Sequence, residues 1–290
     1  MVELQPYKHG YYLWLYVPSL AAAVIFCLLF GVATIAHVWK ICKTRTWFCI
    51  PFAIGGYMQF LGYAARAAAH SRTGKFMPYV IQNNNIVLAP VLYAASIYMV
   101  LGRVIRNVSG ERYSLIRPTR LTKIFVTGDV FSLMIQGGGA GMSIVAKYAE
   151  LAQRIIIAGL VIQIIIFGLF WATAGLFHRR MRRCGTLVKG DSSWESTLKV
   201  LYAMSALIMA RSVFRVIEFS MGMKGYLLAH EWTMYIFDSV PMFIVMVIFW
   251  RWFPAKLKRP GSRGSMIPLA NHDDHLSARG TLGDRFGVRG

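Results

Sequence analysis

The sequence is poor in the residues that cover a water-soluble protein. Only 15% of its 290 residues are charged, whereas 56% are hydrophobic. A soluble domain of this size needs more polar surface than such a composition provides. The composition therefore excludes an ordinary soluble domain and indicates that lipid forms part of the solvent around the folded chain.

Acidic residues are scarce even among the charged ones. The chain has 12 Asp and Glu against 32 Lys and Arg, a formal net charge of +20. Such an excess suits nucleic-acid binding when the basic residues share one water-exposed face, but here they stand in short segments between long apolar runs. We interpret them as membrane-orientation signals and expect no nucleic-acid partner.

Seven apolar runs follow one another, each close to the roughly 20 residues that a helix needs to cross the hydrocarbon core. They cover residues 18–38, 47–69, 79–101, 121–143, 155–177, 198–219 and 232–253. The sequence therefore predicts an all-α integral membrane protein with seven transmembrane helices.

Lys and Arg are divided unevenly between the two sides of these runs. Segments 39–46, 102–123, 178–199 and 251–290 hold 23 of them, whereas 1–17, 70–78, 144–154 and 220–231 hold 6. Basic residues collect on the cytoplasmic side, so we expect the N-terminus outside and the C-terminus in the cytoplasm. We expect an extracellular segment at 1–17, a transmembrane domain at 18–253 and a disordered basic cytoplasmic tail at 254–290.

Cysteine is rare, and the predicted outside segments contain none. The four cysteines lie within the first run or at the cytoplasmic side, at Cys27, Cys42, Cys49 and Cys184. Because disulfides form in oxidising compartments, this distribution excludes an extracellular disulfide.

Polar residues inside or at the edge of the runs occur in pairs spaced by seven positions. The pairs are Gln59 with Arg66, Asp129 with Gln136, Arg211 with Glu218, and Glu231 with Asp238. Seven residues make two helical turns, so each pair lies on one helix face. An ionisable group in hydrocarbon costs roughly 2.5–3.5 kcal/mol, so such groups pair with one another or face a cavity.

These residues form the candidate site, beneath the outer leaflet according to the predicted orientation. We expect a polar vestibule or buried network that binds a substrate or ion, and no catalytic residues. Its members are Arg66, Asp129, Gln136, Arg211, Arg215, Glu218, Glu231 and Asp238. The alternative is an ion-pair network that only holds the outer helix ends together.

Asp129 lies nearest the midplane and has no Arg or Lys on its own helix face. Three alternatives follow for its carboxylate: an ion pair with Arg211 or Arg215 across the bundle, protonation, or a cation supplied by the substrate.

The order of these residues resembles that of the fungal lipid-translocating exporter family, also called the aminocholesterol-resistance family. The resemblance covers most of residues 11–253 and includes Tyr-Val-Pro-Ser at 16–19, Gly-Tyr-Ala-Ala-Arg at 62–66 and Arg-Ser-Val-Phe-Arg-Val-Ile-Glu at 211–218. One departure is Gln59, which stands where a glutamate is expected. Arg66 then needs an acidic partner from another helix, and Glu218 and Glu231 are the candidates.

The resemblance implies a plasma-membrane protein that exports or flips amphiphilic lipids such as sphingoid long-chain bases and is linked to resistance to toxic amphiphiles. Its partners would be membrane lipids, with a cationic amphiphile as substrate and the amine near Asp129, Glu231 or Asp238. The glycine run 137–141 lacks the Lys-Ser/Thr ending of a phosphate-binding loop. We therefore expect no ATP-binding site, so movement would be downhill or coupled to a proton.

A seven-helix lipid sensor or receptor-like modulator of membrane lipid asymmetry is the alternative function, because it has the same helix number and orientation. A zinc-dependent membrane hydrolase needs several histidines around one metal. The predicted topology instead puts His37 and His178 at the inner side and His70 and His230 at the outer side. We expect no enzyme activity, no cofactor and no metal site.

Overall fold

The computed structural model describes residues 14, 16–71, 73–108, 112, 114, 116–142, 148–183, 193–222 and 225–253, which belong to one compact unit. The predicted tail at 254–290 and most of the predicted extracellular segment at 1–17 lie outside these residues.

Six long helices and one composite helix make up most of the described chain. The long helices are α1 (Leu20–Thr44), α2 (Ile50–Ala69), α3 (Phe76–Asn107), α4 (Pro118–Met142), α5 (Ala149–Arg183) and α6 (Ser193–Ser220), with the short helix η1 (Trp47–Cys49) before α2. After the short helix α7 (Tyr226–Ala229), the composite helix consists of α8 (Glu231–Met234), η4 (Tyr235–Ser239) and α9 (Val240–Arg251). The described residues include no strand.

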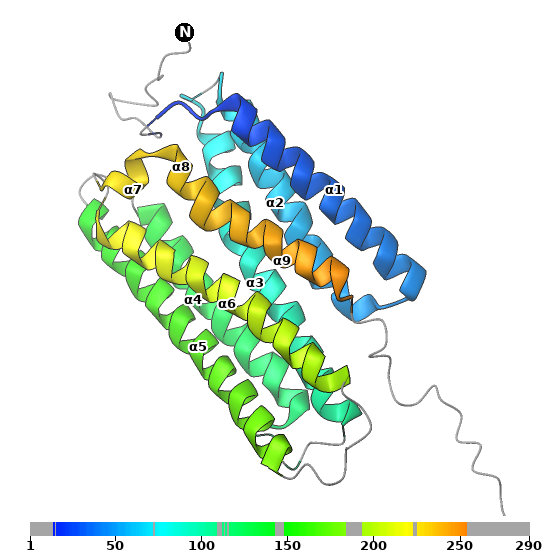
Figure 1. The fold of residues 1–290 in the computed structure, drawn as a ribbon. Coiled ribbons are helices and arrows are strands. Elements are labelled where there is room, and N and C mark those ends of the chain that lie inside the picture. The colour runs from blue at the N-terminus through cyan, green and yellow to red at the C-terminus, as the bar shows by residue number, and fades with distance from the viewer. Residues whose placement is uncertain are drawn as a thin grey trace, which may run out of the picture. The chain divides into compact units, whose positions relative to one another are not determined.

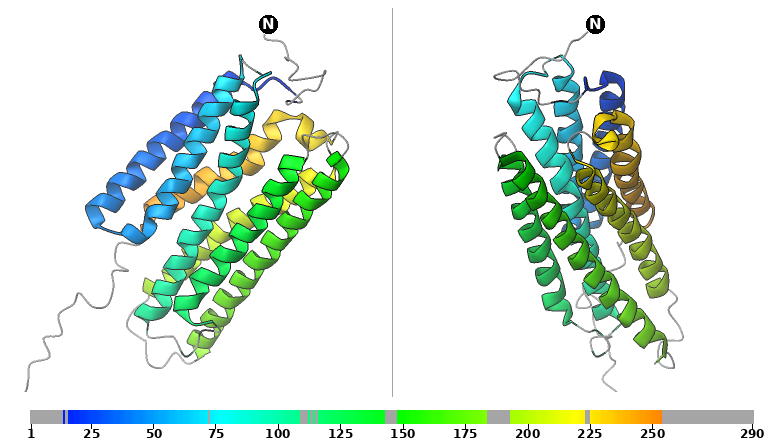
Figure 2. Two further views of the ribbon diagram at one scale, coloured as in Figure 1. Left: turned by 180° about the vertical axis from the view of Figure 1, so that it is seen from behind. Right: turned by 90° about the vertical axis from the view of Figure 1, so that its left-hand side faces the viewer.

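The helices lie side by side in a bundle (Figure 1). Each long helix from α1 to α5 contacts the long helix that follows it in the chain, and α9 contacts both α1 and α6. A further contact between α3 and α6 crosses the interior. In Figure 2, α1, α2 and α9 lie on one side of the bundle and α4 and α5 on the other, with α3 and α6 between them.

Six helices are long and apolar enough to cross a membrane. They cover Leu20–Thr44, Trp47–Ala69, Phe76–Asn107, Ala149–Arg183, Trp194–Ser220 and Glu231–Arg251. α4 is 25 residues long but is not among them, because Asp129, Gln136 and its glycines lower its mean hydropathy. The all-α fold with membrane-type helices is confirmed, whereas a seventh crossing at α4 stays a prediction.

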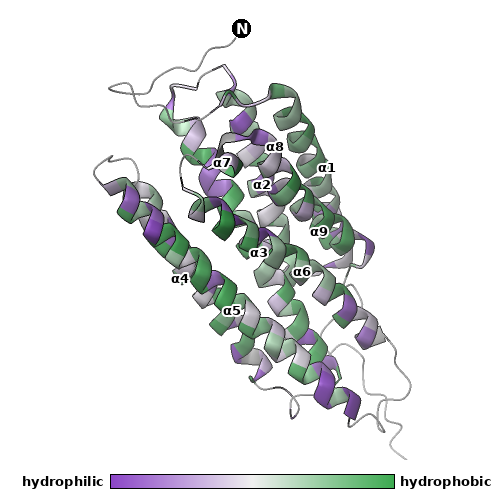
Figure 3. Cartoon of the chain, turned by 60° about the vertical axis from the view of Figure 1, so that its left-hand side comes forward, coloured by the Kyte–Doolittle hydropathy of each residue, from purple (hydrophilic) through white to green (hydrophobic). Residues whose placement is uncertain are grey.

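The outward surface of the helices is apolar. On α1, Leu28, Val32 and Ile35 have exposed fractions of 62%, 68% and 71%. In Figure 3 the helices are mostly green along their middle, and purple residues are more frequent toward the helix ends. Large apolar patches of this kind are rare on soluble monomers, and hydrocarbon accommodates them.

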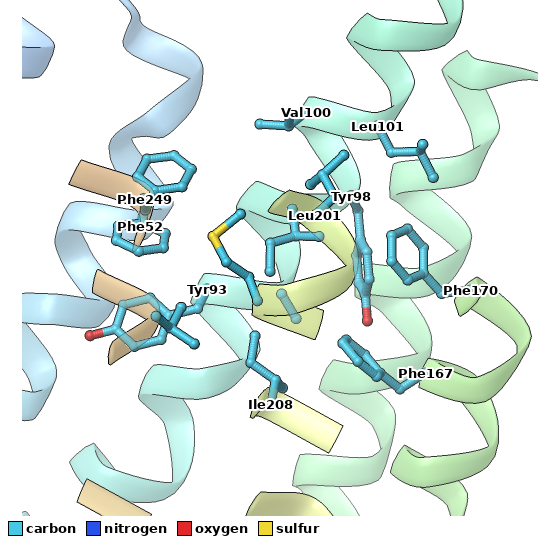
Figure 4. Close-up of a cluster of buried hydrophobic side chains, with 14 of the residues drawn as sticks. Phe52, Tyr93, Tyr98, Val100, Leu101, Phe167, Phe170, Leu201, Ile208 and Phe249 are labelled. Atoms are coloured by element: carbon cyan, nitrogen blue, oxygen red, sulfur yellow. The ribbon is translucent and has the colours of Figure 1, made fainter. Parts of the chain in front are cut away.

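Aromatic side chains fill much of the core between the helices. Phe52 of α2 stacks on Phe249 of α9 with ring centroids 4.0 Å apart, and Tyr98 of α3 lies 4.5 Å from Phe170 of α5. Figure 4 shows these rings as two groups on either side of α3 and α6. Aromatic rings bury large apolar areas, and these ring contacts join helices that do not follow one another in the sequence.

Two prolines lie inside helical segments and affect them differently. α3 continues through Pro90, whereas Pro241 is preceded by a π-helical turn, η4, in which the N–H of Val240 donates to the carbonyl of Tyr235. Proline removes a backbone donor and crowds the preceding turn, so a wider turn there relieves the conflict. Such π-turns occur often at functional sites, and this one carries Asp238.

Candidate functional site

Arg66 is buried at one end of the bundle and binds a carboxylate from another helix. It is 1% exposed, and its Nη2 lies 2.7 Å from Oε1 of Glu231 at the start of α8. Its Nε donates to the hydroxyl of Tyr235 at 3.0 Å. The predicted need for an acidic partner is therefore met by Glu231, one of the two candidates.

The segment before α1 covers this ion pair. The backbone N–H of Ser19 lies 2.9 Å from both carboxylate oxygens of Glu231, and Nη2 of Arg66 donates to the Tyr16 hydroxyl at 3.1 Å. Trp14, Tyr16 and Tyr235 place their ring centroids 5.4–5.7 Å from the guanidinium carbon, within the range of cation–π attraction. The pair is thus enclosed by hydrogen bonds and aromatic rings.

Asp238 forms the second centre, where it binds two arginines from α6. Arg211 donates through Nε to Oδ1, and Nη2 of Arg215 lies 2.6 Å from Oδ2. Arg215 also binds Glu218, with Nη1 3.1 Å from Oε2. Asp238 is 1% exposed, so two cations and two anions neutralise one another in the interior, as buried charges require.

Arg211 also compensates for the proline in α3. Pro90 has no N–H to donate to the carbonyl of Ile86 four residues earlier. Nη2 of Arg211 donates to that carbonyl at 3.0 Å. One guanidinium therefore joins α6, α3 and η4.

Asp129 lies near the middle of α4, apart from both centres. It is 1% exposed, and its Oδ2 accepts a hydrogen bond from the Tyr98 hydroxyl of α3 at 2.8 Å. Its Oδ1 is buried and has no hydrogen-bond partner among the described residues. The structure does not show the predicted alternative of an ion pair with Arg211 or Arg215: among the described residues both arginines bind Asp238, and neither bonds to Asp129.

The remaining predicted member, Gln136, forms an uncharged hydrogen bond to the neighbouring helix. Its Nε2 donates to Oε1 of Gln163 on α5 at 3.1 Å. The structure thus brings the predicted residues into three groups: Arg66 with Glu231; Arg211, Arg215 and Glu218 with Asp238; and the α4 residues Asp129 and Gln136, which face α3 and α5 separately.

Several partners in these groups were missed by sequence reasoning. Tyr98 donates to Asp129 and Tyr16 accepts from Arg66, yet tyrosine is common in this chain, with 14 copies. Tyr235, which accepts from Arg66, is predictable from the sequence, because its position four residues after Glu231 puts both on one helix face. The Ser19 N–H, a backbone group, has no signature in the sequence.

The fold and its paired internal charges define a multi-pass helical membrane protein. Residues 52–260 match the family model described as RTA1 like protein, and the chain belongs to this family. This membership confirms the resemblance to a fungal, lipid-related family of membrane proteins.

Curated relatives from the yeast Saccharomyces cerevisiae align over most of their length. Protein RTA1 is 36% identical over 275 residues, which are 85% of this chain and 86% of the relative. Protoporphyrin uptake protein 1 is 33% identical over 276 residues, covering 83% and 91%. Sphingoid long-chain base transporter RSB1 is 27% identical over 279 residues, covering 80% and 70%. No solved structure matches the chain.

The ion pair between Arg66 and Glu231 can be tested with a double-mutant cycle. Arg66→Met should lower the free energy of unfolding by about 3–5 kcal/mol, because it leaves a largely buried carboxylate without its cation. Adding Glu231→Gln should recover part of this loss, measured as the unfolding temperature of the purified protein and as its abundance in the membrane.

Two variants serve as controls for this cycle. Glu218→Gln should combine additively with Arg66→Met, because Glu218 binds Arg215. Arg154→Met breaks the pair with Glu150, in which both side chains are exposed, and should have little effect. Additive behaviour of Arg66→Met with Glu231→Gln would contradict the pairing.

Proposed function

We propose that this protein is a membrane transporter or translocase that exports or flips amphiphilic lipids such as sphingoid long-chain bases. The relative named as a sphingoid long-chain base transporter supports a lipid substrate. The buried charges support a route for a polar headgroup, because polar groups are costly in hydrocarbon unless they serve pairing or binding. We further propose residence in the plasma membrane and a link to resistance to toxic amphiphiles, as the family resemblance implies.

The proposed topology has seven crossings, with α4 as the fourth. Its 25 residues extend about 37 Å at 1.5 Å per residue, which exceeds the hydrocarbon thickness of about 30 Å. Its Asp129, Ser132 and Gln136 are buried within the protein, so the polar residues that lower its hydropathy do not face lipid. We propose that the N-terminus lies outside and the C-terminus in the cytoplasm.

The observation that carries the substrate class is the unpartnered Oδ1 of Asp129. Of the three acids considered as amine sites, Asp238 binds two arginines and Glu231 binds Arg66 and the Ser19 N–H. The carboxylate of Asp129 accepts one hydrogen bond, from Tyr98 to Oδ2, and its Oδ1 has no partner among the residues that the structure describes. A protonated amine supplies the charge and the donor that this oxygen lacks.

The surroundings of Asp129 suit the same ligand. The ring of Tyr98 packs against Phe125, Phe167 and Phe170, with centroids 4.5–6.0 Å away. Aromatic faces attract ammonium groups, and they offer apolar surface to the carbons beside the amine. We propose that Asp129 binds the amine while the hydrocarbon chain of the substrate stays in lipid.

We assign the remaining site residues a supporting role in this transport. Their ion pairs and hydrogen bonds join α2 to the composite helix, α6 to α3 and the composite helix, and α4 to α5. These residues are Arg66, Gln136, Arg211, Arg215, Glu218, Glu231 and Asp238.

A lipid sensor or modulator of lipid asymmetry is the second candidate. The ion pairs of Asp238 and Glu231 favour a sensor. A transporter that used these acids would have to break the pairs to bind its substrate, whereas a sensor that changes shape in response to lipid would not. A sensor would alter signalling and leave the efflux of sphingoid bases unchanged.

The topology predicts which tags antibodies reach on intact cells. A tag before Met1 should be labelled without permeabilisation, and a tag after Gly290 only after it. The reason is the excess of Lys and Arg in the segments assigned to the cytoplasm. Labelling of the C-terminal tag on intact cells would contradict the orientation.

Asp129→Asn tests whether Asp129 binds the substrate or only supports the fold, because it removes the charge of the side chain and keeps its size. In cells that lack the natural chain, the variant should reach the membrane at normal abundance. Efflux of a labelled sphingoid base should fall about ten- to a hundredfold, the effect of losing one charge-assisted hydrogen bond.

The control for this variant is Glu150→Gln, which removes an exposed carboxylate and should leave efflux unchanged. Loss of abundance together with efflux would show that Asp129 is a structural partner. Normal abundance with full efflux would move the amine site to Glu231 and Asp238.

A further inference from the structure

The charges of the two ion-pair centres cancel without Asp129. Three arginines are paired with three acids in these centres, namely Arg66 with Glu231, and Arg211 and Arg215 with Asp238 and Glu218. Asp129 is a further buried acid, 1% exposed, and belongs to neither centre. As an ion it would add an uncompensated negative charge to the interior, which is costly in hydrocarbon.

The helices packed against Asp129 bring no charge to its carboxyl among the described residues. α4 packs against α3 and α5. From α3, the Tyr98 hydroxyl donates to Oδ2. From α5, the uncharged rings of Phe167 and Phe170 lie beside the ring of Tyr98 (Figure 4). On α4 itself, the hydroxyl of Ser132 bonds to the backbone carbonyl of Asp129. Within the described part of the chain, Tyr98 is thus the only titratable group bonded to this carboxyl, and Oδ1 has no partner.

Two exchangeable cations can neutralise such a carboxyl. A proton on Oδ1 makes the side chain a neutral acid, and a bound ammonium group forms a neutral pair with the carboxylate. The bare carboxylate, with neither cation, is the state that a low-dielectric interior disfavours most. Because Oδ1 accepts either the proton or the ammonium group, binding of one requires release of the other.

We propose that the Asp129 carboxyl exchanges a proton for the substrate amine, so that the chain is an antiporter of protons and amphiphilic amines. The proposal rests on the transport function above and selects proton coupling over downhill movement. As the ammonium group binds, the O–H bond at Oδ1 breaks and the proton passes to water on the side from which the amine came. On the other side the amine leaves, and Oδ1 takes up a proton from water.

This exchange is electrically neutral, because one positive charge moves in each direction. Both loaded states of Asp129 are neutral inside the bundle, whereas the empty carboxylate is not. The empty site therefore cannot easily change sides, and amine movement stays coupled to proton movement. An inward proton gradient would then drive export of the amine against its own gradient.

The paired acids are less suited to the exchange. Asp238 is held by Arg211 and Arg215, and Glu231 by Arg66. A proton on either acid would leave buried guanidinium groups without their anion. Exchange at Asp129 leaves these pairs intact.

The first test measures proton release when the amine binds. The purified full chain in lipid nanodiscs is mixed, in weakly buffered medium of mildly acidic pH, with a long-chain primary amine or with the alcohol of equal chain length. An indicator dye follows the pH. The amine is already an ammonium ion in this medium, so released protons come from the protein. About one proton should appear per amine bound, and none with the alcohol.

Variants assign the released proton to its residue. Asp129→Asn has no carboxyl and should bind the amine more weakly and release no proton. Asp129→Glu keeps a carboxyl and should release one. The matched control is Glu150→Gln, which removes an exposed carboxyl and should behave like the natural chain. Proton release that persists in Asp129→Asn, or its absence from the natural chain, would overturn the proposal.

The pH dependence of amine affinity needs only the natural chain, so it does not depend on whether a variant folds. A proton and an amine that compete for one oxygen make the affinity for the amine fall as the pH falls. The slope should approach about tenfold per pH unit, the value for one proton. Affinity that stays constant from mildly acidic to neutral pH would contradict the exchange, even if the amine binds at Asp129.

Transport in proteoliposomes distinguishes failure of the coupling from failure of the transport function. A pH gradient should drive the amine toward the acidic side, beyond its level in protein-free liposomes, and a membrane potential alone should have no effect. Movement that ignores the pH gradient would overturn the coupling and leave the transport function. Proton release on binding without any movement of the amine would overturn the transport function and with it the antiport, as expected of a sensor.

Discussion

Most of the buried polar structure depends on Asp238, the carboxylate that binds two arginines. Arg211 and Arg215 are one turn apart on α6, so both guanidinium groups reach the same acid. Glu218 completes a set of two cations and two anions. An isolated charge is too costly in hydrocarbon, so each of these four residues requires the others, and α6 must lie against η4.

The same constraint extends to the rest of the bundle. Pro90 has no N–H to donate to the Ile86 carbonyl, and Arg211 donates to this carbonyl instead. The bond links α3 to α6. In the composite helix, Glu231 lies seven residues before Asp238 and binds Arg66 of α2. Asp129 is outside this set, and among the described residues its carboxylate bonds only to Tyr98. Glu231 and Asp238 are held in ion pairs, whereas the Asp129 carboxylate has an oxygen without a partner among the described residues. This difference separates the residues that support the fold from the candidate binding residue.

Much of this arrangement could be predicted from the sequence, because hydrocarbon thickness determines the length of apolar runs and a spacing of seven determines a shared helix face. Glu231 was one of two predicted partners for Arg66. The choice between them, the partner of Asp129 and the role of Tyr98 depend on how helices rotate and slide against one another, which no single helix encodes. The π-turn before Pro241 is a detail that a proline alone does not specify. α4, whose crossing of the membrane is a proposal, shows that the hydropathy of a helix with a polar face can fall below the level of the other six.

The most direct test of this account is the stability of Asp238→Asn. Measured by thermal unfolding of the purified protein, with Glu150→Gln as the exposed control, the variant should lose about 3–5 kcal/mol because Arg211 and Arg215 are left without their shared anion. Unfolding at the temperature of the natural protein would contradict the claim that this carboxylate holds the bundle together.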